Sequence, residues 1–411
     1  MMERVLIFAV LGVAALFLLV TLVIIVEKAS REIREGSRRA RRRLLEPLVL
    51  RYAHGADASI VAAAGGSLGA ADRVVVEAIF LDHVARVRGI EHERICRALD
   101  ELGFVDRFLE ALSSRNWWKR AEAAEKLGLA GAKRATPRLT VALEDDVAEV
   151  RLRAAKALGL VGGRAGVLPL IQALSEPNRW STIRIADILA AMGRDVVSEL
   201  MEAFPTQNLH AKLAALDILG RIHALTAVPW LVALLADRER DVRARAAHAL
   251  GEIGAGDAAP QLRSALTDRE WPVRAMAAKA LGLVRDAAAI PALCAALRDR
   301  EWWVRANAAA ALKVMGPKGV EALEGMLQDA DLFAQHQACL ALEDAGILDR
   351  RVSQLGTFGI VGSAAESIVT RFVRAGRVGR LHELATSHAE PAVREVLGRI
   401  LPREIAPGAA R

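Results

Sequence analysis

Hydrophobic and polar positions repeat along most of this chain with a period close to 31 residues. In the copy at 299–312, Val304, Ala308, Ala311 and Leu312 stand at i, i+4, i+7 and i+8, which places them on one apolar stripe of a helix. The same pattern occurs one and two periods earlier in the chain. A unit this small cannot bury its own stripe, so the period predicts copies that stack on one another.

Each copy is predicted to contain two helices. A glycine follows the first stripe and predicts a helix end in a left-handed turn, at Gly128, Gly159, Gly220, Gly251 and Gly282. A second apolar run opens on a proline, which suits a first helical position, at Pro169, Pro229, Pro260 and Pro291. The predicted unit is therefore a helix, a glycine turn, a proline-started helix and an Asp-containing turn into the next copy.

Charged residues also recur at fixed places in the period. An arginine stands within the first helix and an aspartate precedes it by six residues, which gives Asp145 with Arg151, Asp237 with Arg243, Asp268 with Arg274, and Asp299 with Arg305. Arg120 and Lys212 occupy the arginine position in other copies. We expect a structural ladder in which guanidinium groups bridge the turns of adjacent repeats.

The pattern Asp-x-x-x-x-Val-Arg-x-x-Ala-Ala-x-Ala-Leu-Gly, followed by a Pro-Leu helix, resembles HEAT repeats of the type first noted in phycobilin lyases. The resemblance covers Ser114 to Asp344, with irregular copies at 180–204 and 331–344. It implies an all-α fold, an α-solenoid of HEAT-like helical hairpins. It implies little about function, because repeats of this kind bind many different molecules.

Residues 5–26 form a run without a charged side chain. As a helix this run would extend about 33 Å, enough to cross a hydrocarbon core of about 30 Å. A cleaved signal peptide is the rival interpretation, but the run is long and is followed by a poor cleavage sequence. We therefore expect one transmembrane helix ahead of the solenoid.

Basic residues crowd the C-terminal side of this run, so the positive-inside rule predicts that the solenoid lies on the cytoplasmic side of a bacterial-type inner or plasma membrane. Three cysteines without paired spacing agree with a reducing compartment. The candidates for contact with anionic lipid are Arg38, Arg39, Arg41, Arg42 and Arg43.

The predicted organisation has six segments. They are a short extracytoplasmic N-terminus at 1–4, the transmembrane helix at 5–26, a basic juxtamembrane segment at 27–44, an N-terminal helical cap at 45–113, the repeats at 114–344, and a degenerate repeat with a C-terminal cap at 345–411. The cap at 45–113 could also be a separate binding domain. We expect a faint final copy at 390–398 and a frayed tail from Ile405.

The charge of the chain belongs mostly to its N-terminal arm. Residues 1–43 carry nine Lys and Arg against four Asp and Glu, a net +5 of the formal +7. The remaining body is close to neutral, whereas a surface that follows phosphates needs an excess of positive charge. Nucleic-acid binding is therefore the least favoured class.

No recognisable catalytic motif is present, and we predict no cofactor, no metal and no enzymatic activity. His382 and Glu383 begin like a zinc-binding helix, but Thr386 stands where the second histidine would be required. The deoxyhypusine hydroxylases have repeated His-Glu pairs, whereas no histidine of the repeat region is followed by Glu here. The alternative is an enzyme or accessory subunit with an unrecognised site in the N-terminal helical region, for which the residues to test are Asp82, His83, His92 and Glu93.

All seven tryptophans lie in the repeats, and most stand just ahead of the recurring arginine. One interpretation is packing between repeats on the arginine stems; the other is an exposed ridge for a partner, since Trp and Arg dominate interface hot spots. The predicted binding edge comprises Trp117, Trp118, Trp180, Trp271, Trp302 and Trp303. The apolar run 231–235 offers a groove as a second surface. We predict a scaffold for a membrane or membrane-associated protein, for example a membrane glycosyltransferase.

Overall fold

The computed structural model describes residues 2–56, 59, 68–176, 181–357 and 359–402, with side chains from residue 17 onward. Within these ranges the chain is all-α and contains no strand. It forms two compact units, an N-terminal unit at Met1–Pro169 and a C-terminal unit at Leu170–Arg411. The predicted all-α class is thereby confirmed.

The N-terminal unit contains a long first helix and a set of shorter ones. They are α1 (Met2–Ala53), α3 (Ala70–Val84), α4 (Ile90–Glu101), α5 (Phe104–Ala111), α6 (Trp117–Leu129), α7 (Thr136–Ala142) and α8 (Ala148–Val161), and α9 (Gly163–Ala173) begins in this unit. Phe80, Phe104, Ile95 and Leu99 are fully buried and form the core of α3, α4 and α5. Helices α6 and α8 pack closely against each other.

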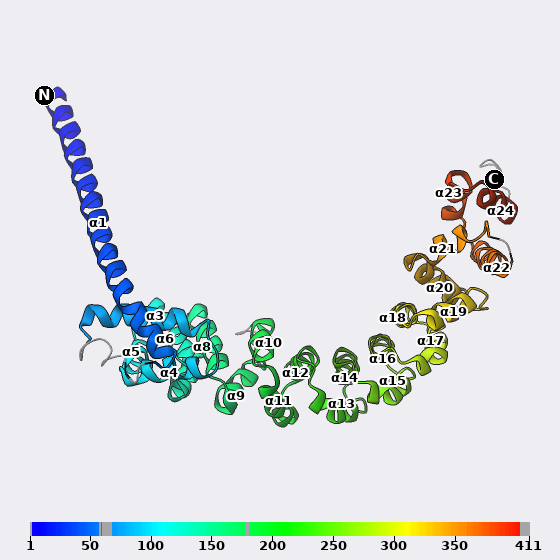
Figure 1. Cartoon of the computed structure of the whole chain (residues 1–411), viewed down its shortest axis with the longest axis horizontal. Coiled ribbons are helices and arrows are strands. Elements are labelled where there is room, and N and C mark those ends of the chain that lie inside the picture. Colours follow the sequence, from blue (N-terminus) through cyan, green and yellow to red (C-terminus); the bar gives the residue numbers. More distant parts are fainter. Residues whose placement is uncertain (1, 57–58, 60–67, 177–180, 358, 403–411) are drawn as a thin grey trace. The chain divides into compact units, whose positions relative to one another are not determined.

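The C-terminal unit continues the alternation of longer and shorter helices. They are α10 (Thr182–Ala191), α11 (Val197–Ala203), α12 (Leu209–Arg221), α13 (Val228–Leu234), α14 (Arg240–Ile253), α15 (Ala259–Ala265), α16 (Trp271–Val284), α17 (Ile290–Ala296), α18 (Trp302–Val314), α19 (Pro317–Met326), α20 (Leu332–Asp344), α21 (Ile347–Ser353), α22 (Ile360–Arg374), α23 (Gly379–Ser387) and α24 (Pro391–Ile400). In Figure 1, α12, α14, α16 and α18 stand side by side in one row, and α13, α15 and α17 form a second row. This is the stacking of helical hairpins that defines an α-solenoid.

The repeat glycine has a role that the sequence analysis missed. Gly251 and Gly282 lie inside α14 and α16, and the left-handed residues that follow these helices are Gly254 and Arg285. A Cβ added to Gly251 would lie 2.7 Å from the Cα of Ala280 in the next long helix. The predicted glycine turn is therefore wrong at these positions: the glycine lets two helices meet backbone against backbone, and the helix ends one turn later.

The proline prediction is confirmed in most copies. Prolines stand in the first turn of α13, α15 and α17, each after a short 3-10 turn. Pro169 is the exception, because it lies inside α9. Proline is suited to the start of these short helices, because the N–H of a residue in the first turn makes no hydrogen bond within the helix.

Helix α1 contains the predicted membrane span at 5–26. The helix that contains this run continues without a break into the charged residues that follow, as far as Ala53. Across the part of the chain that the structure describes, no helix combines the length and the apolarity of a membrane crossing. The predicted single-pass location in an inner or plasma membrane, with a cytoplasmic solenoid, is therefore wrong.

The last described helix retains one feature of the repeats. In α24, Val393 and Leu397 are buried, and Arg394 donates to the carbonyl oxygens of His388 and Ala389, as the repeat arginines do in their own turns. The faint copy at 390–398 stays a prediction, with which these hydrogen bonds agree. The tail from Ile405 lies outside the described residues.

The glycine contact generates the first prediction. Replacing Gly251 by Ala would normally favour a helix by about 1 kcal/mol, but the new methyl group must displace the backbone of Ala280, at a cost of about 1–3 kcal/mol. We expect Gly251→Ala to lower the urea midpoint of unfolding. The control is Gly325→Ala in α19, where a Cβ meets open space and the midpoint should rise. A stabilised Gly251→Ala variant would contradict the close packing.

Candidate functional site

The turns between repeats are held by bridging guanidinium groups. Arg243 in α14 donates from Nη1 to the carbonyl oxygens of Asp237 and Arg238 in its own repeat, at 2.9 and 3.2 Å. From Nε and Nη2 it donates to both carboxylate oxygens of Asp268 in the next repeat, at 2.9 and 3.0 Å. Asp268 also accepts the N–H of Glu270 at 2.8 Å, which shapes the turn. One side chain thus joins two successive turns.

The same geometry recurs in both units. Arg274 donates to both oxygens of Asp299 at 2.6 and 2.8 Å, and in the N-terminal unit Arg120 donates to both oxygens of Asp145 at 2.7 and 2.9 Å. Arg151 donates to the carbonyl oxygens of its own turn at Asp145 and Asp146. The structure therefore brings together arginines and aspartates of neighbouring repeats.

The ladder changes where a copy departs from the pattern. The guanidinium of Arg305 donates to the carbonyl oxygens of its own turn and lies 4.8 Å from the ring centroid of Phe333 in the next long helix. Lys212, at the arginine position of α12, lies over the ring of Phe204 at 5.4 Å. Arg305 thus has an aromatic ring of the next long helix as its neighbour, whereas the ring beside Lys212 belongs to the segment ahead of α12.

The ladder lowers the pKa of its carboxyl groups. For Asp268, burial acts to raise the pKa, but the hydrogen bonds from Arg243 and from the N–H of Glu270 hold it below its ordinary value. For Asp299, burial likewise acts to raise the pKa, but the hydrogen bond from Arg274 holds it below its ordinary value. For Asp145 the hydrogen bond from Arg120 is the largest cause of a lowered pKa. These aspartates are therefore held as carboxylates in the folded chain.

Large apolar side chains stand exposed in the first turn of consecutive long helices. Trp271 opens α16 and is 39% exposed, and Trp302 and Trp303 open α18 and are 51% and 57% exposed. Leu332 and Phe333 open α20 and are 74% and 67% exposed. Because these helices stack in register, the five side chains lie along one border of the C-terminal unit, which we call the apolar edge.

Two residues of this edge, Leu332 and Phe333, were not among the residues predicted from the sequence. They follow Trp302 by one period of the repeat but are not tryptophans. The two indoles of α18 pack edge to face, with ring centroids 4.7 Å apart. Trp117 and Trp118 are half-exposed at the equivalent place in the N-terminal unit, and the prediction for Trp180 lies outside the described residues.

Trp230 and the run 231–235 do not share this exposure. Trp230 packs edge to face on Phe204, with ring centroids 4.9 Å apart, and Leu231 is fully buried. Trp230 and Leu231 are thus engaged in packing, and the groove predicted on the run 231–235 stays a prediction.

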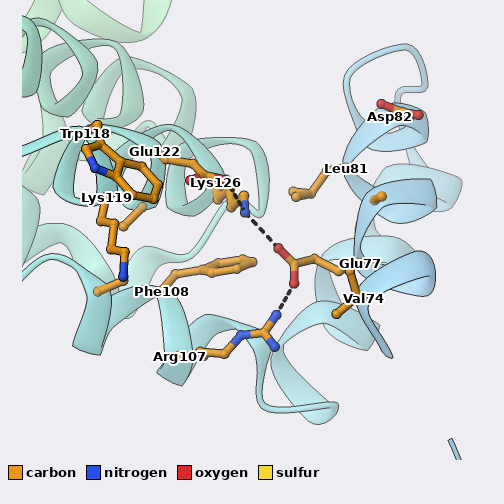
Figure 2. A pocket seen from close by; sticks show the side chains of 13 residues that line it. Val74, Glu77, Leu81, Asp82, Arg107, Phe108, Trp118, Lys119, Glu122 and Lys126 are labelled. Carbon is orange, nitrogen blue, oxygen red and sulfur yellow. Dashed lines mark hydrogen bonds and ion pairs between the residues drawn. The ribbon is translucent and has the colours of Figure 1, made fainter. Parts of the chain in front are cut away.

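The N-terminal unit has a groove of about 630 Å³ between α3, α5 and α6 (Figure 2). Its lining includes Phe108 and Trp118, and its centre holds Glu77, whose side chain is only 9% exposed. Glu77 pairs with Arg107 and with Lys126, the latter at 2.9 Å from Nζ to Oε1. The buried carboxylate is thus neutralised in place, and the arrangement fastens α3 to the two helices opposite.

Two of the alternative catalytic residues, Asp82 and His92, have neighbours within the fold. Asp82 accepts a hydrogen bond from Arg42 at 2.8 Å, and His92 lies beside Cys96 one turn away in α4, 3.6 Å from Nδ1 to Sγ. Burial raises the pKa of the Cys96 thiol to about 11, so the reactive thiolate is scarce at neutral pH. Among the described residues no group of three or more His, Cys, Asp or Glu side chains could hold a metal ion.

Two arginines of the predicted lipid contact are engaged by the protein itself. Arg41 pairs with Asp72 at 2.6 Å and Arg42 with Asp82 at 2.8 Å, and both contacts join α1 to α3. The lipid contact predicted for Arg38, Arg39, Arg41, Arg42 and Arg43 stays a prediction.

Fold and ladder together define an α-helical repeat protein whose surfaces are built by stacked hairpins. The sequence model described as HEAT repeats matches residues 105–178 and 228–313. HEAT repeats are therefore present in both units, and stacks of such repeats commonly mediate protein–protein interactions. No comparison supports the narrower resemblance to phycobilin lyases. No curated protein matches the chain.

Several solved structures are similar to the chain. An engineered protein is 21% identical, with 72% of this chain and 97% of that chain covered, at a TM-score of 0.35. The karyopherin Kap121p bound to Pho4p is 12% identical, with 87% and 49% covered, at a TM-score of 0.44. Human deoxyhypusine hydroxylase in complex with glycerol is 22% identical, with 61% and 99% covered, at a TM-score of 0.26. The chain spans about half the length of the karyopherin structures.

The ladder generates the second prediction. Replacing Asp268 by Asn keeps the shape of the turn but removes the charge that Arg243 binds, and we expect a loss of about 1–3 kcal/mol in the free energy of unfolding at neutral pH. Because the pKa of Asp268 is lower in the folded state, the ion pair contributes fully above about pH 4 and is lost as the pH falls through the folded-state pKa. The difference between wild type and variant should therefore shrink in acid.

Urea unfolding at a series of pH values measures this difference. The control is Asp187→Asn, because the pair that Asp187 forms with Arg221 is half-exposed on both sides and should contribute about 1 kcal/mol or less. If Asp268→Asn costs no more than the control, or costs the same amount at every pH, the ladder does not stabilise the stack as described.

Proposed function

We propose that this chain is a protein-binding scaffold and that its docking surface is the apolar edge. The observation that carries the proposal is the exposure of Trp271, Trp302, Trp303, Leu332 and Phe333 at one position of consecutive repeats. Scattered exposed apolar residues are common, but a contiguous row of large ones is typical of an interaction surface. Packing within the repeats does not require such exposure.

The chemistry of the edge suits a protein partner. Trp and Arg are enriched at protein interfaces, and a tryptophan that becomes buried in a complex can contribute 2 kcal/mol or more, on the order of thirtyfold in affinity. Bridging guanidinium groups fix the turns that carry these tryptophans, as Arg274 does for the turn that precedes α18. A fixed surface loses little conformational entropy when it binds.

The test is crosslinking and mass spectrometry of the full-length protein in cell extract, beside a variant with Trp271, Trp302 and Trp303 changed to Ala. We expect a specific protein partner to crosslink with the wild type and to be reduced at least about tenfold with the variant. Circular dichroism and thermal unfolding check that the variant keeps its fold; Trp302 and Trp303 are 51% and 57% exposed, and Trp271 is 39% exposed.

The matched control replaces two exposed apolar residues of the same unit that lie away from the edge, Leu225 and Leu283. This variant should retain the partner. If the folded tryptophan variant recovers the same partner as the wild type, the apolar edge is not the docking surface.

A further inference from the structure

We propose that His248 is a pH-sensitive residue of the C-terminal unit, and that its protonation in mildly acidic solution weakens the packing of α14 against α12 and α16. The inference does not depend on the apolar edge. It rests on the position of the imidazole between three stacked helices, on a buried ring nitrogen that lacks a hydrogen-bond partner, and on the charges around the ring.

The imidazole lies where three successive repeats meet. Helix α14 packs closely against α12 and α16. His248 borders a hollow of about 330 Å³ between α10, α12 and α14, and a second hollow of about 390 Å³ between α12, α14 and α16. Its side chain is 22% exposed. A change in the charge of this ring therefore acts on the contacts of α14 with both of its neighbours.

One nitrogen of the ring makes no hydrogen bond. Nδ1 is buried and has no partner among the described residues, and Oε1 of Glu252, one turn further along α14, lies 3.9 Å away, beyond hydrogen-bond distance. A neutral imidazole can keep this nitrogen unprotonated, whereas an imidazolium carries an N–H on both nitrogens. Protonation therefore places a charged N–H at a buried position without an acceptor, which costs free energy.

Charged residues surround the ring on both neighbouring long helices. Asp217 of α12 and Lys279 of α16 stand one period before and one period after His248, so the three residues occupy the same position of successive repeats. Arg245 of α14 donates to Asp217 at 2.9 Å. The carboxylate on one side is thus already paired with a guanidinium, while Lys279 brings a positive charge on the other side.

The remaining charges near the ring come from α12 and from α14 itself. Arg221 of α12 lines the first hollow and pairs with Asp187 at 2.8 Å, and Asp241 of α14 lines the second hollow. Helix α13, which also packs against α14, contributes no titratable side chain over Val228–Leu234. The ring therefore meets charges of both signs, and burial decides which protonation state the fold prefers.

The folded chain favours the neutral ring. Burial is the largest cause of a lowered pKa at His248, and the positive charge of Lys279 adds to it. The carboxylates of Glu252 and Asp217 act in the opposite direction without cancelling it. In the unfolded chain a histidine takes up its proton near about pH 6.5. Below that pH the unfolded state binds more protons than the folded state, so stability is lost as the pH falls toward the lower folded-state pKa.

Asp217 has the opposite effect on stability in acid. Burial raises the pKa of its carboxyl group, and a carboxyl group that binds a proton more readily in the folded chain adds stability as the pH falls. A variant that removes the imidazole but keeps Asp217 separates the two contributions.

Hydrogen exchange of the full-length protein, followed by mass spectrometry at about pH 7.5 and about pH 5.5, measures the opening of individual helices. After correction for the intrinsic effect of pH on exchange, we expect protection of α12, α14 and α16 to fall at least about threefold at the lower pH, up to a limit of about tenfold that the unfolded-state pKa sets. Helix α20, which packs against α18 and α19, should change by less than about twofold.

Three variants assign the effect to the site. His248→Gln should abolish the loss of protection in acid. Lys279→Gln removes a charge that lowers the pKa of His248 and should reduce the loss, whereas Glu252→Gln removes a charge that raises this pKa and should increase the loss. The control is His336→Gln in α20, an exposed histidine of the same unit, which should behave as the wild type.

Circular dichroism checks the fold of each variant. Lys279 is exposed and the side chain of Glu252 is 39% exposed, so these two variants keep the test decisive if His248→Gln does not fold. Unchanged protection of the three helices in acid, an equal loss in His248→Gln, or shifts of the same sign in Lys279→Gln and Glu252→Gln would each overturn this inference. A loss that extends equally to α20 would also overturn it, because acid would then destabilise the unit as a whole.

Discussion

The structure depends on a guanidinium group that belongs to two repeats at once. Arg243 holds its own turn through two carbonyl oxygens and the next turn through the Asp268 carboxylate. A repeat this small has too little apolar surface to stand alone, so the contact between neighbours determines whether the stack forms. The side chain of Arg243 is 6% exposed, and such a buried charge is tolerated because its guanidinium nitrogens bond to the Asp268 carboxylate and to two carbonyl oxygens.

A second contact fixes how closely the repeats approach. Where Gly282 faces Ala311, a Cβ would lie 2.8 Å from the neighbouring Cα, so the absence of a side chain allows the helices to pack by their backbones. The ladder defines which turns are neighbours, and the glycine lets the C-terminal ends of the long helices approach closely.

Much of the repeat geometry could be predicted from the sequence, and the failures have identifiable causes. The repeat period and the apolar stripe that includes Val304 predict stacked helices, because apolar residues at these spacings lie on one face of a helix. The role of Gly251 could not be predicted, because a glycine can either end a helix or allow two helices to pack closely. Only the contact with Ala280 in the neighbouring helix shows that close packing is its role. Leu332 and Phe333 could not be predicted from residue type, because tryptophan stands at their position only in other copies. The membrane span was predicted from the apolar run 5–26 and its basic flank, but among the described residues no helix has the length and apolarity of a membrane crossing.

The turn sequence Asp-Arg-Glu places a structural aspartate next to an exposed arginine. At 299–301 the Asp299 carboxylate is committed to Arg274, whereas Arg300 is exposed beside Trp302. A substitution at the aspartate therefore alters the stack, but one at the arginine leaves the ladder intact and changes only the surface. The residues that stabilise the stack and those that form its surface thus occupy neighbouring positions. The repeats can therefore keep their packing while the exposed side chain changes from copy to copy, as it does from Arg240 at the start of α14 to Trp271 at the start of α16.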